Sequence, residues 1–333
     1  MEEIEQDIGA DGDHGGSLWR DAWRSLVARR TTRACLVVVA IFTLVALYGE
    51  SVYRWHQWRD TTPPCQRTSL AERYQPPSLL RKPFASLKSD VSAPLISRLG
   101  QCARNLANHP LGTDNLGRDV LQRLVQGTRI AFLVGVITAL IAIPIGVLLG
   151  CLAGYCGGKV DDFIVWLYSS VASMPGLLFI LAIAMIAGKG LLGVFLGIGL
   201  TTWVSLCRLI RGEVMKQREL AYVTAARALG YSHGRILFRH ILPNVMHLVI
   251  ITFSLRFPAA IGTEVFISFL GIGVQNEPSW GIMINNARLR LWQGVWWEMT
   301  FVTLAIFVVV LAFNLLGDAL RDALDPRLRS SER

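Results

Sequence analysis

The residues whose types could do chemistry form neither a nucleotide-binding P-loop nor an H-E-x-x-H metalloprotease motif. The string closest to a nucleotide-binding P-loop, AGYCGGKV, begins with Ala153 and ends with Val160, where the pattern requires Gly and then Ser or Thr. None of the six histidines begins an H-E-x-x-H metalloprotease motif. We therefore expect this chain not to be an enzyme, to hold no catalytic residue and to bind no metal ion.

Two ionisable residues, Arg256 and Glu264, fall within one apolar segment. In a helix that enters the membrane near Val245, Arg256 would lie about 16 Å deep and Glu264 about 12 Å further. That separation is too large for a direct ion pair. A charge inside a bilayer costs about 2.5–3.5 kcal/mol on insertion scales and usually has a partner or a wet cavity. We therefore expect each residue to have its own partner elsewhere.

A cationic stretch interrupts the apolar sequence in the second half of the chain. Residues 223–244 read VTAARALGYSHGRILFRHILPN and contain no Asp or Glu. The first part predicts a short helix that ends at Gly230, because glycine readily takes the left-handed conformation that closes a helix. A second helix follows and leads to Pro243. The residues therefore predict a compact surface of two short helices, and a solvated basic loop beside anionic lipid is the alternative.

Long apolar segments must hold these residues in place. Hydrophobic residues make up 52% of the 333 residues and charged residues 17%, against about 25% charged in soluble domains. A bilayer span needs about 20 mostly apolar residues. This criterion predicts an all-α membrane protein with six spans, at 33–50, 129–154, 162–187, 190–208, 245–272 and 299–317. Only GKG separates the third span from the fourth, so a single buried hairpin is the alternative there.

Positive charge predicts the orientation of these spans. Lys and Arg gather in the short segments on the side of the termini, which predicts that this side is cytoplasmic. The expected divisions are a cytoplasmic tail with an interfacial helix (1–32), the first span (33–50) and an external segment (51–128). A five-helix core (129–317) follows, with a cytoplasmic coupling loop at 211–243, and a second cytoplasmic tail (318–333) ends the chain. Topology explains the net charge of +9, so no nucleic-acid partner is expected.

The external segment also contains a candidate surface helix. Thr113 or Asp114 is expected to cap an amphipathic helix that runs to Gln126, because apolar residues recur along it at helical spacing.

The cationic stretch resembles the EAA loop of ABC importer permeases. That pattern is E-A-A, three residues, Gly, and about nine residues later an apolar residue, any residue, Leu and Pro. Its places are held here by Thr224, Ala225, Ala226, Gly230, Leu242 and Pro243. Thr224 stands where the family has Glu, and His240 stands where the isolated apolar residue is expected. In that family the loop is the coupling helix, which docks in a cleft of an ATPase subunit.

Four further segments resemble the peptide/nickel branch of these permeases, in particular the C-type subunit of dipeptide and oligopeptide importers. They are HPLGTDNLGRDVLQRLVQGTRI, SMPGLL, TEVFISFLGIGVQNEPSWG and LLGDALRDALDPRLR, at 109–130, 173–178, 263–281 and 315–329. The resemblance implies a type I importer permease core, MetI-like in fold, in a bacterial plasma (inner) membrane. It implies a peptide as substrate; nickel or another small solute is the alternative, and an ion-driven secondary transporter is a more distant one.

The resemblance also implies partners. These are a second related permease, two cytoplasmic ATPase subunits that bind ATP and Mg, and an extracytoplasmic substrate-binding protein; the chain itself would hold no cofactor. Arg256 is then predicted to face the central pathway or the partner permease, where it could meet a peptide carboxylate. Glu264 matches the Glu before the family's SFLGLG-like stretch, which implies a structural role such as capping or pairing at the permease interface.

Cys65 and Cys102 are the only cysteines of the external segment, and an oxidising compartment permits a disulfide bond. We predict that they pair. Mass spectrometry of the unreduced protein should find neither thiol alkylated; alkylation of both would show two unrelated thiols.

Overall fold

The computed structural model describes residues 27, 29–78, 109–275 and 277–324, and the regular elements among them are helices apart from one isolated bridge between Thr113 and Asp119. Five helical stretches in this part of the chain are long and apolar enough to cross a membrane: α2 (Arg30–Trp58), α5 (Val120–Cys156), α8 (Leu191–Gln217), the stretch that contains α11 (Leu242–Phe269), and α13 (Trp297–Leu324). The predicted all-α membrane class is confirmed.

The third predicted span, 162–187, is not one straight helix. It divides into α6 (Gly158–Ala172) and α7 (Gly176–Ile186), which are bent by 89° and would supply a sixth crossing only as a pair. Pro175 lies at the break, where proline lacks an N–H and disfavours a helical conformation in the preceding residue. Beyond α7, Gly188 and Gly190 have φ of 96° and 134° and turn the chain into α8.

The helix before the second span also differs from the prediction. Thr113 and Asp114 do not cap it; Asp119 does, and its side chain accepts hydrogen bonds from the N–H groups of Leu121 and Gln122. The helix that begins at Val120 then continues unbroken to Cys156. The predicted surface helix is therefore the first part of α5, because no residue between the two segments stops the helix.

Asp114 instead stabilises the loop before α5 through hydrogen bonds to its carboxylate. Its Oδ2 accepts hydrogen bonds from Arg118 Nε (2.7 Å) and Arg123 Nη1 (2.9 Å), and its Oδ1 accepts from the backbone N–H groups of Leu116 and Arg118. Burial raises the pKa of Asp114, but the charge of Arg123 and these hydrogen bonds outweigh it, so the net pKa lies below the ordinary value. An ionised Asp114 thus fixes the loop.

Glycines bring α5 and α8 into close contact. Gly146, Gly150 and Gly154 recur every four residues on the face of α5 that meets α8. A Cβ on Gly150 would lie 2.8 Å from the Cys207 carbonyl oxygen, and one on Gly154 would lie 2.7 Å from that of Arg211. Small residues at this spacing let helix backbones approach closely inside a membrane. The α5–α8 pair is therefore the spine of the bundle.

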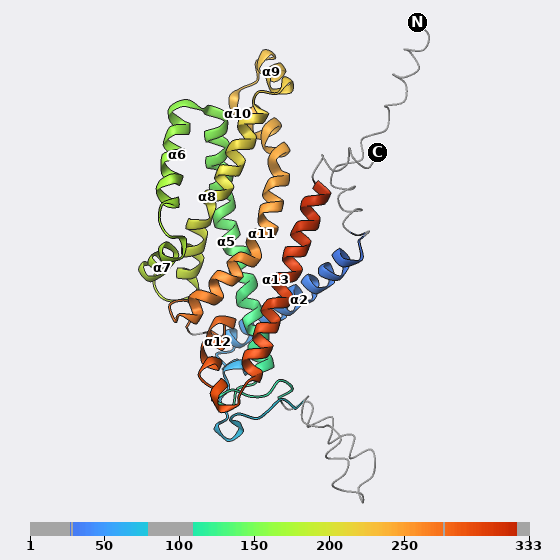
Figure 1. Cartoon of the computed structure of the whole chain (residues 1–333), viewed down its shortest axis with the longest axis vertical. Coiled ribbons are helices and arrows are strands. Elements are labelled where there is room, and N and C mark those ends of the chain that lie inside the picture. Colours follow the sequence, from blue (N-terminus) through green and yellow to red (C-terminus); the bar gives the residue numbers. More distant parts are fainter. Residues whose placement is uncertain (1–26, 28, 79–108, 276, 325–333) are drawn as a thin grey trace, which may run out of the picture.

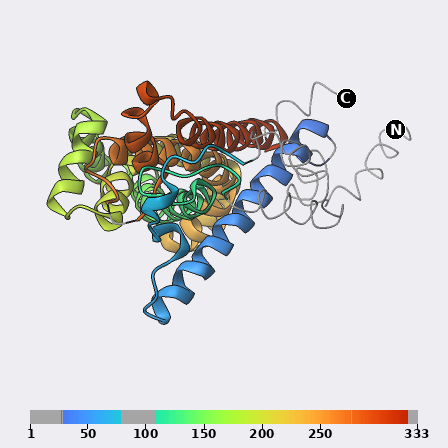
Figure 2. The ribbon, with the colours of Figure 1, turned by 90° about the horizontal axis from the view of Figure 1, so that it is seen from below.

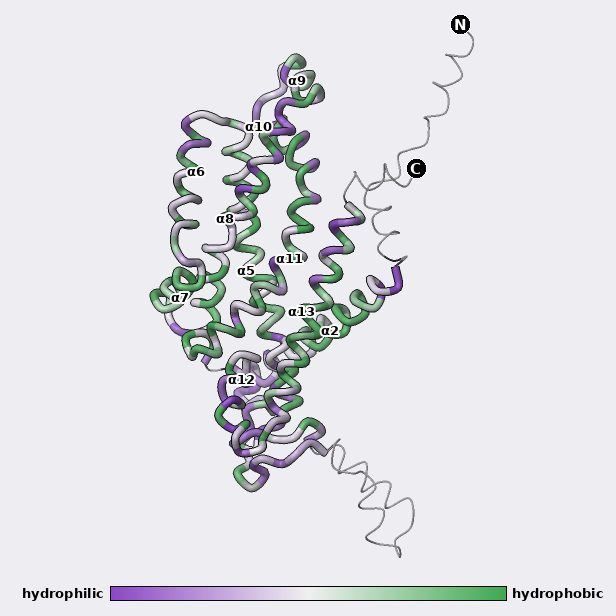
Figure 3. Tube along the Cα trace, viewed as in Figure 1, coloured by the Kyte–Doolittle hydropathy of each residue, from purple (hydrophilic) through white to green (hydrophobic). Residues whose placement is uncertain are grey.

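The remaining helices are arranged along this spine (Figure 1). The short helices α9 (Ala221–Ala228) and α10 (His233–Ile236) lie at one end of the molecule, and α12 (Trp280–Arg288) lies toward the other. Figure 2 shows α2 running along the outside of the bundle. Apolar residues dominate the long helices between the ends, while polar residues gather around α10 and near α12 (Figure 3).

The two described ends of the chain meet. Arg29, just before α2, pairs with Asp322 near the end of α13 at 3.1 Å, as expected if an even number of crossings separates them. The first helix runs past the predicted limit of 50 to Trp58. The predicted interfacial helix near Ser17 and most of both predicted tails lie outside the described residues.

Gly150→Ala and Gly212→Ala make a matched test of the spine. Alanine is about 1 kcal/mol better than glycine in a helix interior, and the Cβ of residue 212 on α8 would meet nothing within 4 Å. At Gly150 the same methyl group overpacks the α5–α8 contact, which typically costs about 1–3 kcal/mol. Thermal unfolding in detergent should show a lower apparent Tm for G150A and an equal or higher one for G212A. Equal shifts would contradict the close-contact argument.

Candidate coupling surface and central cavity

The stretch 221–243 forms a small platform at one end of the bundle (Figure 1). α9 ends at Gly230, whose φ of 77° is left-handed as predicted. The N–H of Tyr231 donates to the Ala226 carbonyl oxygen at 3.1 Å, and that of Gly230 donates to the Arg227 carbonyl oxygen at 2.9 Å. These bonds close α9 in the manner of a glycine-capped helix. The predicted helix, glycine stop and second helix are therefore present.

The six residues of the EAA-like pattern do not share one exposed surface. Thr224, Ala225, Gly230 and Pro243 are exposed, whereas Ala226 is buried and Leu242 is half-buried. Ala226 packs with buried residues of α5, α8 and α11. Ala226 therefore contributes to the packing of α9 on its own chain and is not available on the outer surface. Leu229 adds an apolar side chain, 72% exposed, to the outer surface.

Polar contacts tie this platform to the ends of the spine. The Tyr155 hydroxyl, in the last turn of α5, lies 3.0 Å from Nδ1 of His233 in α10. The hydroxyl of Tyr222 in α9 donates to Oε1 of Gln217, the last residue of α8, at 2.7 Å. The platform is thus attached to both spine helices, so a displacement of α9 would be felt by α5 and α8.

A π-helical segment connects the platform to α11. It spans Leu237–Ile241 and lies directly before Leu242 and Pro243. His240, one of the departures from the family pattern, lies in this segment, and its ring stacks on Tyr231 with centroids 5.8 Å apart. π-helical turns inside α-helices often occur at functional positions.

Residues 230–234, GYSHG, fit the letters of the G-x-S-x-G motif. In serine hydrolases the motif lies on a strand-to-helix turn. Here Ser232 joins two short helices, and the His233 ring contacts Tyr155. The structure therefore gives this serine no nucleophile geometry.

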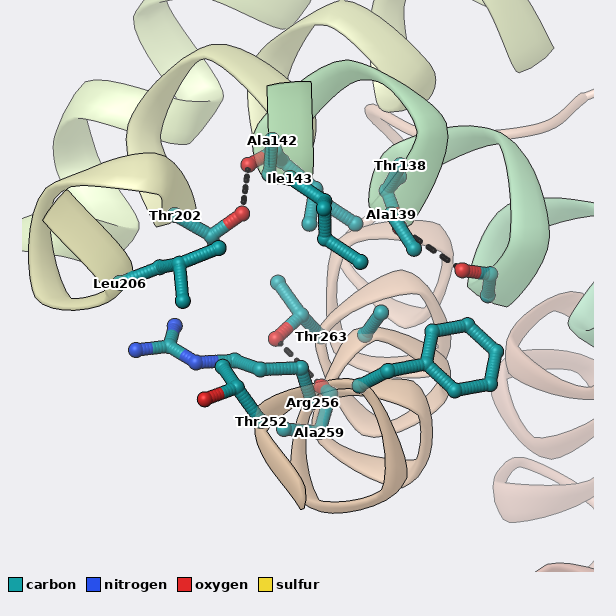
Figure 4. Close-up of a pocket in the computed structure, with 14 residues that line it drawn as sticks. Thr138, Ala139, Ala142, Ile143, Thr202, Leu206, Thr252, Arg256, Ala259 and Thr263 are labelled. Atoms are coloured by element: carbon teal, nitrogen blue, oxygen red, sulfur yellow. Dashed lines mark hydrogen bonds between the residues drawn. The ribbon is translucent and has the colours of Figure 1, made fainter. Parts of the chain in front are cut away.

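A cavity of about 140 Å³ lies between α5, α8 and α11 (Figure 4). Arg256 of α11 is the one charged residue of its lining, and Figure 4 shows the guanidinium group on the side of Leu206. Hydroxyl groups reach the lining from all three helices: Thr138 of α5, Thr202 of α8, and Thr252 and Thr263 of α11. Sequence reasoning missed these threonines because single hydroxyls in apolar helices carry no periodic signal.

Glu264 lies elsewhere, fully buried where α11 meets α12. The Ser268 hydroxyl donates to its Oε1 at 2.7 Å, and the same hydroxyl accepts from the Val274 N–H at 3.1 Å. Because Glu264 has no exposed surface in this chain, its predicted place on a pathway or at an interface between permeases is wrong. Its contacts instead stabilise the turn that ends α11, as a local structural role requires.

The other predicted site is the Cys65–Cys102 pair. Cys65 is buried and is bonded to no other cysteine of the described residues, while Cys102 lies outside them. The pairing stays a prediction. In the described part of the chain, no group of three or more His, Cys, Asp or Glu side chains could hold a metal ion.

An unforeseen charged cluster lies near the end of α2. Arg129 of α5 pairs through Nε with Glu50 of α2 (2.5 Å) and through Nη1 with Glu277 (2.6 Å), and its guanidinium group lies 3.7 Å from the centroid of the Tyr53 ring. The cluster fastens α2 to α5 and to the segment before α12. The positions of Glu50 and Arg129 at the outer edges of two consecutive predicted spans could have indicated it.

A bundle of apolar helices with a docking platform at one end and a cavity in the middle defines a membrane transport subunit. Residues 146–330 match the family described as binding-protein-dependent transport system inner membrane component, and residues 17–77 match the N-terminal TM domain of oligopeptide transport permease C. The chain belongs to this family of ABC importer permeases.

Its relatives match over most of their length. The dipeptide transport system permease protein DppC of Bacillus subtilis is 34% identical over 94% of this chain and 87% of that protein. The oligopeptide transport system permease protein OppC of Escherichia coli K12 is 33% identical over 95% and 93%. The glutathione transport system permease protein GsiD of Pectobacterium atrosepticum is 41% identical over 67% and 74%. A solved chain of the MetNI methionine ABC transporter aligns over 62% of this chain and 98% of that chain, at 16% identity and a TM-score of 0.49.

Proposed function

We propose that this chain is the C-type permease subunit of an ATP-driven importer of dipeptides or oligopeptides. The names of its relatives support a peptide substrate, since they specify dipeptides, oligopeptides and glutathione, itself a small peptide. The cavity supports nickel poorly, because Arg256 lines it and no His, Cys, Asp or Glu does. The ion-driven alternative loses its basis, since the family is defined by dependence on a binding protein.

In this proposal the chain forms half of the pathway and a second related permease forms the other half. Two ATPase subunits, which bind ATP and Mg, contact the platform 221–243 from the cytoplasm. A substrate-binding protein delivers the peptide at the α12 end. The membrane is the plasma (inner) membrane of a bacterium, with both termini on the side of α9.

The observation that carries the proposal is the construction of the platform. Its outer surface combines small residues, Thr224 and Ala225, with the exposed Leu229. Such a surface can enter an apolar cleft of another protein. Its inner side is bonded to the ends of α5 and α8 through Tyr155 and Gln217, and these are two of the three helices that line the cavity. A movement imposed on the platform therefore has a rigid path to the cavity.

Co-expression with candidate permease and ATPase subunits from the same genome tests the assignment. The complex should purify as one assembly with two ATPase subunits, and proteoliposomes that contain it should accumulate labelled trialanine only with ATP and the binding protein. Uptake driven by an ion gradient without ATP would overturn the proposal.

Gly230→Val and Gly230→Asn test the coupling role of the platform. Valine at a left-handed φ costs roughly 1 kcal/mol or more, whereas asparagine tolerates this conformation. A Cβ at this position meets nothing within 4 Å, so the two variants differ mainly in backbone strain. G230V should reduce ATP-dependent uptake several-fold at unchanged abundance in the membrane, and G230N should keep most of it. Normal uptake by G230V would contradict the role of the platform.

A further inference from the structure

The charge of Arg256 is unmatched within this chain. In the described part of the chain, no hydrogen bond or ion pair engages its guanidinium group. Two other arginines of the long helices are paired with carboxylates: Arg129 has two, and Arg211 of α8 makes two hydrogen bonds to Asp161 of α6, at 2.5 and 2.6 Å. A charge at membrane depth is costly unless it has a partner. An arginine that faces a cavity and has no partner in its own chain is therefore expected to bind a negatively charged group that enters the cavity.

The hydroxyl groups around Arg256 present the opposite hydrogen-bonding character. Thr138 donates to the Val134 carbonyl oxygen, Thr202 to that of Ile198, and Thr263 to that of Ala259, all within their own helices. Because each hydroxyl hydrogen is used in this way, the oxygens can offer lone pairs as acceptors toward the cavity. The cavity therefore combines one cationic donor with several neutral acceptors.

A free peptide C-terminus has the complementary pattern. Its carboxylate accepts hydrogen bonds and carries the negative charge, and the amide N–H next to it donates. Guanidinium groups bind carboxylates through two parallel hydrogen bonds, which adds geometric specificity. A peptide amide lacks the charge, and a peptide's N-terminal ammonium group would be repelled by Arg256.

The size of the cavity fits an end group rather than a whole peptide. Pockets for small ligands usually enclose about 300–1,000 Å³, and this cavity holds about 140 Å³. Ala139, Ala142 and Ala259 make room in its walls. The remainder of a peptide would have to lie beyond this chain, toward the second permease of the proposed assembly.

We propose that Arg256 binds the C-terminal carboxylate of the transported peptide during its passage through the membrane. This inference rests on the proposed peptide importer. It assigns a specificity-determining residue to the permease itself, in addition to any selection by the binding protein.

Paired probes test this role in the complete complex in proteoliposomes. Uptake of trialanine is compared with uptake of trialanine amide, each supplied at a concentration that saturates the same binding protein. Arg256→Gln should lower trialanine uptake about tenfold or more, as expected for loss of a charged hydrogen-bonding partner, and should leave amide uptake nearly unchanged. Arg256→Lys, which keeps the charge, should retain part of the preference. Arg208→Gln is the control, because Arg208 lies on α8 over the Tyr168 ring and does not line the cavity.

The outcomes separate this inference from the proposed function. If the wild-type complex imports neither probe, the peptide assignment itself fails. If it imports trialanine and R256Q changes both probes equally, or neither, the carboxylate role is wrong. Loss of the second permease from purified R256Q would instead identify an acidic side chain of that subunit as the partner of Arg256, and would also overturn the inference.

Discussion

The close approach of α5 and α8 is the constraint on which the rest of the structure depends. Gly146, Gly150 and Gly154 let the two backbones come so close that a side chain at any of these three positions would collide with α8. The contact holds the ends of both helices together, and there Tyr155 and Gln217 are bonded to the platform. Inside a membrane such packing must supply the stability that the hydrophobic effect gives to a soluble core.

The cavity lies further along the same pair of helices. Beyond the glycines, α5 contributes Thr138 and α8 contributes Thr202, and α11 completes the wall. The same two helices therefore contact the platform at their ends and line the cavity further along. α11 joins them a second time, because it begins at the π-helical turn of the platform and carries Arg256 to the cavity.

Arg129 and Arg256 differ in whether a carboxylate lies beside the guanidinium group. Arg129 has Glu50 and Glu277 as partners, so it holds helices together and is not available to a ligand. Arg256 has no such partner among the described residues and lies beside a cavity. Since an uncompensated charge at this depth is costly, a difference in pairing distinguishes a structural arginine from a candidate functional one better than depth does.

The sequence by itself determined the helical class, the number of apolar segments and the platform, because these depend on local composition and on single residues such as Gly230 and Pro243. It could not predict that 162–187 bends by 89°, since prolines inside helices are often tolerated, as Pro144 in α5 shows. Nor could it assign Glu264, Ala226 or the threonines of the cavity. Whether a side chain faces a cavity, a neighbouring helix or solvent depends on how the helices pack together, and only the tertiary structure decides that.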